Sequence, residues 1–141
     1  MTIEAARACE LCEQDGGRLI WRGDGCRVVS VDEPGYPGYC RVIWNAHVRE
    51  MTDLPAPERA RFMLVVFALE AALRDVLRPE KINLASLGNV TPHLHWHVIP
   101  RFRDDPHFPN PVWGARIRQP DPLAQARRDL AAALSERLSR L

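Results

Sequence analysis

Short hydrophobic runs fill the first third of the chain, and glycine or proline bounds each of them. RLIWR (18–22) and CRVVSV (26–31) are separated by the tight reversal GDG (23–25), and this spacing predicts a β-hairpin. The segment DEPGYPG (32–38) predicts a loop because its prolines and glycines disfavour regular pairing. The next run, YCRVIWNAH (39–47), predicts a third strand.

A helical spacing of apolar residues follows. It starts near Pro55 and Pro57, which suit the opening positions of a helix, and Pro79 stops it. The spacing predicts a helix of about six turns over 57–78. The apolar positions that recur at three- and four-residue intervals are Phe62, Val65, Val66, Leu69, Leu73, Val76 and Leu77.

Two further strands and a last helix complete the pattern. KINLASLG (81–88) and HLHWHVIPR (93–101) predict strands, and DDPHFPNPVWG (104–114) predicts an irregular loop. The segment 122–141 has helical spacing. Its apolar side would carry Leu123, Leu130, Leu134, Leu138 and Leu141.

The order of these elements indicates one α+β domain over 1–141, with a core of about 9–101 and a C-terminal loop and helix in 102–141. We expect a five-stranded antiparallel sheet with a long helix and a C-terminal helix on one face. A doubly wound parallel sheet is excluded because it needs a helix between successive strands.

Composition adds limits on the partners of the chain. Of its 141 residues, 46% are hydrophobic and 26% are charged, and the formal net charge is +1. Such a charge gives no broad electrostatic case for binding nucleic acid or a membrane, so an anionic ligand would need a local site. The first 17 residues are charged throughout and contain no apolar core of signal-peptide length, and no segment has the roughly 18 apolar residues of a membrane span. We therefore expect a cytoplasmic protein, in which the four cysteines are free thiols or metal ligands.

Three of the five histidines, His93, His95 and His97, alternate with Leu94, Trp96 and Val98. On a strand, alternate residues share a face, so the imidazoles should lie on one side and the apolar residues should pack on the helices. We expect the imidazole side to line a solvent-exposed or ligand-filled surface, because burying three unpartnered imidazoles would be costly.

Three interpretations of this row remain open from the residues alone. The strand could be half exposed, with histidine at its polar positions by chance. It could hold a metal, although neighbouring side chains on one strand diverge and rarely close around a tetrahedral ion without ligands from elsewhere. It could act in covalent catalysis, where one nitrogen of a neutral imidazole attacks an electrophile and a carbonyl or carboxylate holds the other.

Cys9 and Cys12 have the Cys-x-x-Cys spacing that lets two thiolates reach one zinc ion. A redox role is less attractive because no βαβ unit follows, and two ordinary thiols remain the alternative. Cys26 and Cys40 lie within predicted strands and are interpreted as small buried hydrophobes. His107 and Arg101 are interpreted as surface residues, Arg101 with a possible approach to a phosphate, and Trp113 as a packed loop residue.

The run HLHWHVI resembles the signature of the histidine triad (HIT) superfamily of nucleotide hydrolases and transferases. The flanks agree: GNVTPHLHWHVIPR is similar to the family's Gly-Gln segment and Pro-Arg ending, with Asn89 in the place of Gln. Upstream, PGYCRVIWNAH resembles the family's strand-and-turn block, with Tyr39 and Trp44 replacing a histidine and a proline and His47 retained. The resemblance covers roughly residues 9–101.

By this resemblance, His95 is the nucleophile that attacks the α-phosphorus of a nucleoside phosphate derivative and forms a nucleotidyl-imidazole. His97 would contact the phosphate and the leaving group. Asn89, together with the backbone amides near Val90 and Thr91, would bind phosphoryl oxygens, although Asn89 also suits a turn. Asp32 would contact the ribose or begin the loop that follows it.

The resemblance further implies a structural zinc site of Cys9, Cys12, His47 and His93, so that His93 would brace the strand near the substrate. It implies that the chemistry itself needs no cofactor, and that the protein forms a homodimer through the long helix and a strand. The expected substrate is a nucleoside phosphoramidate or a dinucleoside polyphosphate. A nucleotide-binding regulatory protein with weak catalysis, and a metalloenzyme, are the other functions that the residues allow.

Overall fold

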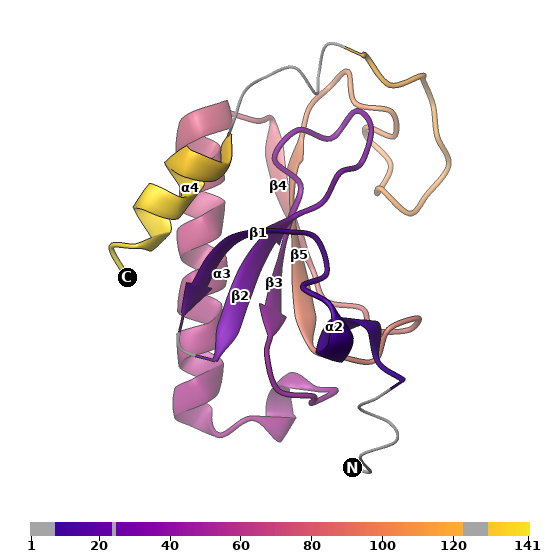
Figure 1. The fold of residues 1–141 in the computed structure, drawn as a ribbon. Coiled ribbons are helices and arrows are strands. Elements are labelled where there is room, and N and C mark those ends of the chain that lie inside the picture. The colour runs from indigo at the N-terminus through magenta and orange to yellow at the C-terminus, as the bar shows by residue number, and fades with distance from the viewer. Residues whose placement is uncertain (1–7, 24, 123–129) are drawn as a thin grey trace.

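Five antiparallel strands form one sheet in the computed structural model, which describes residues 8–23, 25–122 and 130–141. The sheet order is β1-β2-β3-β5-β4, and every neighbouring pair is antiparallel (Figure 1). The strands are β1 (Arg18–Gly23), β2 (Cys26–Ser30), β3 (Cys40–Trp44), β4 (Lys81–Ala85) and β5 (His95–Arg101). The helices are α2 (Glu10–Glu13), the 3-10 turn η1 (Met51–Asp53), α3 (Ala56–Leu77) and α4 (Leu130–Leu138). This architecture confirms the predicted α+β class with its long helix and C-terminal helix.

The long helix α3 begins near two prolines and ends at a residue in the left-handed conformation. Pro55 precedes its first turn and Pro57 lies within it, where a missing N–H costs nothing. Arg78 follows the helix in the left-handed region, with φ 49°, and its N–H bonds the carbonyl of Arg74. The helix is therefore displaced by one residue at each end from the predicted 57–78.

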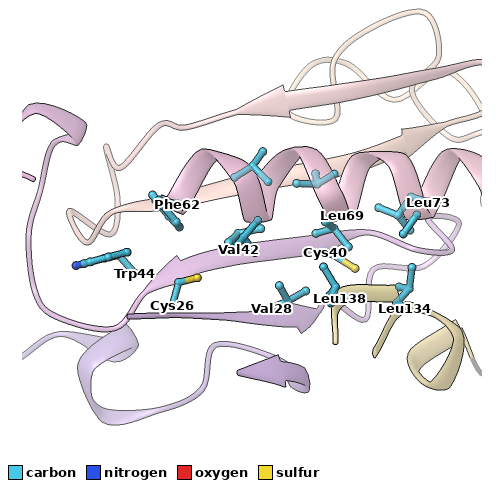
Figure 2. Packing of buried hydrophobic residues seen from close by; sticks show 14 of the residues in the cluster. Cys26, Val28, Cys40, Val42, Trp44, Phe62, Leu69, Leu73, Leu134 and Leu138 are labelled. Carbon is cyan, nitrogen blue, oxygen red and sulfur yellow. The ribbon is translucent and has the colours of Figure 1, made fainter. Parts of the chain in front are cut away.

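The main core lies between the sheet and the two helices α3 and α4. Figure 2 shows α3 above strands β2 and β3, with Phe62, Leu69 and Leu73 pointing toward Val42 and Cys40. Leu134 and Leu138 of α4 lie next to Val28 of β2 in the same cluster. Cys26 and Cys40 are fully buried here, as predicted, and burial raises the pKa of the Cys40 thiol to about 12.

The predicted C-terminal helix is confirmed from Leu130 to Leu138. Its apolar side ends at Leu138, since Leu141 is exposed. Leu123, which the spacing placed on the same side, lies outside the described residues. No helix in the described part of the chain combines the length and the apolar character that a bilayer crossing needs.

Two predicted strands are shorter than expected at the end near the histidines. Strand β4 stops at Ala85, before the turn at Gly88, whose φ is +76°. Strand β5 begins at His95, and His93 lies in the preceding turn, where its N–H bonds the Thr91 carbonyl at 2.8 Å. This turn places His93 outside the hydrogen-bonded strand, so the direction of its side chain does not follow the alternation of β5.

Candidate functional site

The three histidines lie on the face of the sheet opposite α3 and α4. Leu94, Trp96 and Val98 pack with the main core, as the alternation predicts. The imidazoles, however, are buried: His93, His95 and His97 are only 1%, 7% and 6% exposed. The solvent-exposed alternative is therefore wrong, because other parts of the chain cover this face, and the ligand-filled alternative stays a prediction.

Each imidazole has a partner of a different kind. The Nε2 of His93 donates to the backbone carbonyl of Trp44 at 2.6 Å. The Nδ1 of His95 lies at 2.5 Å from the backbone carbonyl of His93. The Nδ1 of His97 lies 2.9 Å from the hydroxyl of Tyr39. These hydrogen bonds offset the cost of burying the three imidazoles. Because the partners differ, the chemical roles of the three rings differ as well.

His95 has the geometry of a nucleophile. Because a carbonyl oxygen only accepts hydrogen bonds, the Nδ1 of His95 must carry the proton, so the lone pair of the neutral ring is on Nε2. No protein hydrogen bond to this Nε2 is formed by the residues that the structure describes. Burial lowers the pKa of His95, and the hydrogen bond to His93 opposes that shift. The ring is therefore neutral near pH 7 and can attack an electrophile.

His97 lies beside the nucleophile, with ring centroids 4.9 Å apart. Burial, followed by the charges of His95 and Arg41, lowers its pKa to about 3. A neutral His97 can donate from Nε2 only if its Nδ1 accepts, and the Tyr39 hydroxyl can supply that proton. Burial raises the pKa of Tyr39, so this hydroxyl keeps its hydrogen.

A second group of side chains meets at the turn before β5. Donor atoms of Cys9, Cys12, His47 and His93 all lie within 4.8 Å of one another. The sulfur of Cys9 is 3.3 Å from Nδ1 of His93, and the sulfur of Cys12 is 3.2 Å from Nδ1 of His47. Zinc bonds of about 2.3 Å to sulfur and about 2.0 Å to nitrogen would separate tetrahedral ligands by about 3.6 Å.

The residues of this cluster fit a zinc ion in chemistry as well as spacing. Two thiols and two imidazole nitrogens form a closed four-ligand set of the structural type. The bond from His93 Nε2 to the Trp44 carbonyl orients the ring so that Nδ1 faces the cluster, as outer-shell partners of metal ligands do. Burial and the neighbouring Cys9 raise the pKa of the Cys12 thiol to about 11, a shift that a central cation would oppose.

Two hollows flank the triad. One, of about 320 Å³, is lined by His93 and His95 together with Gly88, Ser86 and Trp96, among others. Asn89, Val90 and Thr91 follow Gly88 directly but do not line it, and Val90 is 95% exposed. The structure thus brings the loop of the expected phosphate ligands next to the triad, and the Thr91 carbonyl accepts a hydrogen bond from the N–H of His93.

The other hollow, of about 710 Å³, contains Asp32. Gly16, Gly17, Ser30, Tyr36 and Tyr39 are among the residues that share its wall. Tyr39 connects this hollow with the triad, since the same side chain contacts His97. Asp32 is exposed, as a ligand-binding carboxylate would be before a ligand arrives.

Comparison with known proteins decides the family. The model of the HIT domain matches residues 13–104. The chain belongs to the HIT family.

Relatives of this HIT protein agree with the assignment. It is 30% identical over 121 residues to an AP-4-A phosphorylase from Mycobacterium tuberculosis. The alignment covers 82% of this chain and 62% of the relative. The chain thus spans about three fifths of the length of the curated relative it matches. A histidine triad protein from Marinobacter aquaeolei superposes with a TM-score of 0.75 at 27% identity, over 95% of this chain and 96% of that one. A Zn-bound histidine triad family protein from Mycobacterium smegmatis has the same fold, with a TM-score of 0.64, 21% identity and 96% of both chains covered.

Two interpretations of single residues in this HIT domain are wrong. Arg101 is 2% exposed and bonds both oxygens of Asp105, at 2.8 and 3.1 Å, so it is not at the surface. His107 is also buried, and its Nδ1 bonds the hydroxyl of Tyr36. Both residues hold the loop that follows β5.

That loop carries Trp113 to the triad. Trp113 is 52% exposed, and its ring centroid is 4.9 Å from that of His97. The prediction of a packed residue is therefore only half right, because one edge meets His97 and the rest faces solvent. Tyr39, Arg41 and Trp113 are the neighbours of the triad that sequence reasoning did not select. The one available signal was that Tyr39 stands where the family block has a histidine.

Proposed function

We propose that this HIT protein is a nucleotide hydrolase or nucleotidyl transferase that works through a nucleotidyl intermediate on His95. Its substrate would be a nucleoside phosphoramidate or a dinucleoside polyphosphate. The observation that carries the proposal is the hydrogen bond from His95 Nδ1 to the His93 carbonyl, which leaves Nε2 neutral, unpartnered among the described residues and next to a hollow.

The reaction has two displacements at the same phosphorus. In the first, Nε2 of His95 attacks the α-phosphorus, and the bond to the leaving group breaks. His97 hydrogen bonds the departing atom and favours its protonation. In the second, water attacks the phosphorus, the P–N bond breaks, and a nucleoside monophosphate leaves with His95 neutral again.

The remaining candidate residues would position the substrate. Asn89 and the amides of Val90 and Thr91 would donate to phosphoryl oxygens once the loop closes on them. Asp32, across the larger hollow, would accept from ribose hydroxyls. His93 would shape the smaller hollow, whose wall it forms with His95.

The phosphorylase named among the relatives supports the dinucleoside polyphosphate class. It also suggests that the acceptor of the nucleotidyl group in the second displacement could be phosphate. Phosphate in place of water would release a nucleoside diphosphate. Product analysis with and without inorganic phosphate distinguishes these two outcomes.

Replacement of His95 tests the mechanism. His95→Ala should abolish turnover of adenosine phosphoramidate and of a dinucleoside polyphosphate while the far-ultraviolet spectrum stays unchanged. Acid-quenched wild-type protein should gain the mass of one nucleotide, and the variant should not. Turnover by the variant at the wild-type rate would remove His95 from the mechanism. A wild-type protein that binds AMP but turns over neither substrate would favour the regulatory alternative.

We also propose that Cys9, Cys12, His47 and His93 bind one structural zinc ion. The ion would cross-link the N-terminal segment, the turn after β3 and the turn before β5, and it would take no part in the chemistry. Protein purified without chelator should contain about one zinc per chain. Cys12→Ser should lose it, and Cys26→Ser, a buried thiol outside the cluster, should keep it. Protein without zinc, or a Cys12→Ser variant with full zinc content, would refute this site.

A second copy of the chain is the partner we propose for α3. Leu64 and Phe67 of this helix remain 53% and 51% exposed, and β4 is an edge of the sheet, so both can pair with a second copy. Light scattering should give the mass of a dimer for the wild type and of a monomer for Leu64→Glu/Phe67→Glu. A monomeric wild type would exclude the dimer.

A further inference from the structure

Arg41 occupies the middle of the triad face. It lies in β3, where it is paired with Val29 of β2 on one side and with His97 of β5 on the other. Its neighbours in β3, Cys40 and Val42, belong to the helix-covered core, so alternation directs Arg41 to the side of His95 and His97. The sequence alone does not distinguish it from a solvent-facing arginine of a strand.

The guanidinium of Arg41 has no anionic partner among the described residues. It donates from Nη1 to the carbonyl of Gly16, at 3.1 Å, and it also hydrogen bonds the side chain of Tyr39. Its Nε is buried and has no acceptor in the described part of the chain. A half-buried cation with unused donors is unfavourable unless an anion joins it.

Two other arginines of this face are satisfied. Arg27 donates to three backbone carbonyls and to the side chain of Asn45. Arg101 is paired with Asp105 and also bonds Asn83 and the carbonyl of Asn110. Arg41 therefore differs from both in having donor capacity that the folded chain does not use.

The charge of Arg41 reaches the reacting groups. It contributes to the lowered pKa of both His95 and His97, after burial and the nearer partners of each. Arg41 also lowers the pKa of Tyr39 against the larger effect of burial. Arg41 is paired with His97 across the sheet, and the next residue on the same side of β3, Ile43, is paired with His95, so the guanidinium lies close to the space that a phosphoryl group on His95 would occupy.

We propose that Arg41 is the phosphate-binding cation of this site, and that its guanidinium binds oxygens of the phosphoryl group attacked by His95. The inference rests on the proposed function for the identity of the reacting group. A guanidinium matches two phosphoryl oxygens with parallel N–H donors, and such charge-assisted bonds are the strong ones. Arg41 would thus be a catalytic residue that holds the phosphorus against Nε2 and stabilises the charge on its oxygens during both displacements.

The test separates the phosphate from the rest of the nucleotide. Calorimetry should measure the affinities of AMP and of adenosine for the wild type, Arg41→Met and Arg41→Lys. The loss of charge-assisted hydrogen bonds should weaken AMP binding to Arg41→Met by about 10- to 100-fold. Adenosine, which has no phosphate, should bind within about twofold of wild type. Arg41→Lys should recover part of the AMP affinity, because an ammonium keeps the charge but lacks the two-pronged donor.

Arg140→Met is the matched control, since Arg140 is an exposed arginine of the C-terminal end that pairs with Glu136. Its AMP affinity should equal that of wild type. Equal weakening of AMP and adenosine by Arg41→Met would assign Arg41 a structural role and overturn the proposal, as would unchanged AMP binding. If Arg41→Met does not fold, Arg41→Lys decides in its place: AMP affinity equal to wild type supports a charge-only contact and overturns the two-pronged one, and a selective loss supports the proposal.

The same measurements distinguish failure of the proposed function from failure of this inference. A wild type that binds AMP more tightly than adenosine, loses that preference in Arg41→Met and yet turns over no substrate would remove the enzymatic function and leave the phosphate site. A wild type with no preference for AMP would overturn the phosphate site, whatever its turnover.

Discussion

The two faces of the sheet are stabilised in different ways. Under α3 and α4, one continuous cluster of buried apolar residues extends from Trp44 and Phe62 to Leu134 and Leu138. Among the residues that the structure describes, the triad face has two small apolar clusters, one around Leu11 and Ile43 and one around Tyr36 and Ile99. On that face, directional hydrogen bonds hold most of the covering segments against the sheet. The segments that cover this face are held by hydrogen bonds to specific partners in addition to apolar packing.

Arg27 illustrates this kind of fastening. It is 4% exposed and donates to the carbonyls of Leu11, Gln14 and Asp15, at 2.6, 3.1 and 2.9 Å. These bonds hold the segment that carries Cys9 and Cys12 against the sheet. One side chain thus positions half of the ligands of the proposed zinc site.

The largest effect on stability should come from the polar anchor on the triad face. Asp105 accepts hydrogen bonds from Arg101 and from the backbone N–H groups of Phe102, His107 and Phe108. Asp105→Ala leaves the buried guanidinium of Arg101 unpaired, so the free energy of unfolding should fall by about 3–5 kcal/mol in urea titrations. Because this loop carries Trp113, turnover should fall as well.

The neighbouring carboxylate is the control for that prediction. Asp104 is exposed, and Asp104→Ala should change the free energy of unfolding by no more than about 0.5 kcal/mol. Equal effects of the two substitutions would show that the triad face does not depend on this anchor.

A somewhat smaller loss is expected from the apolar face. Leu69 is fully buried in α3, and Leu69→Ala should lower the free energy of unfolding by about 3 kcal/mol through lost burial and a cavity. Leu64→Ala, an exposed leucine of the same helix, should cost well under 1 kcal/mol in a monomeric background. Leu69→Met should retain most of the stability, because non-directional packing tolerates a swap of similar volume. Loss of the fold in Leu69→Met would mean that the apolar face is as intolerant of a change of shape as the triad face is.

The last effect is seen only in acid. His97 has a pKa of about 3 in the folded protein against 6.5 for an ordinary histidine, chiefly because it is buried. The unfolded chain therefore binds a proton at this residue below pH 6.5 that the folded chain does not bind until about pH 3. Stability from this source is complete above pH 6.5 and is lost as the pH falls toward 3.

His97→Gln removes that contribution. Between pH 6 and 4, its plot of unfolding free energy against pH should be shallower than the wild-type plot by up to about one proton per molecule. Leu69→Ala, with His97 intact, should keep the wild-type slope. Parallel plots for wild type and His97→Gln would mean that His97 is protonated equally in both states.

The elements and the triad were predictable because their signals are local. Alternation of apolar and polar residues is sufficient for the strands, and Pro55, Pro57 and Pro79 bound α3 to within a residue. The burial of His97 was not predictable, since it depends on Tyr39 and Trp113, which are distant in sequence. Arg101 and His107 were misassigned for a similar reason: a charged or polar residue among prolines looks like surface until its buried partner, Asp105 or Tyr36, is known. The roles of Asn89 and Asp32 stay predictions.

Three polar groups of His93 act at once. Its Nδ1 faces Cys9, its Nε2 holds the Trp44 carbonyl, and its own carbonyl holds the ring of His95. The side chain of this residue thus belongs to the proposed zinc site, and its backbone carbonyl belongs to the proposed catalytic site. A substitution of Val90, which is 95% exposed, should have little consequence. A substitution of His93 should alter both sites together. On the proposed mechanism and zinc site, His93 takes no direct part in the displacements and yet should be the least replaceable of the three histidines.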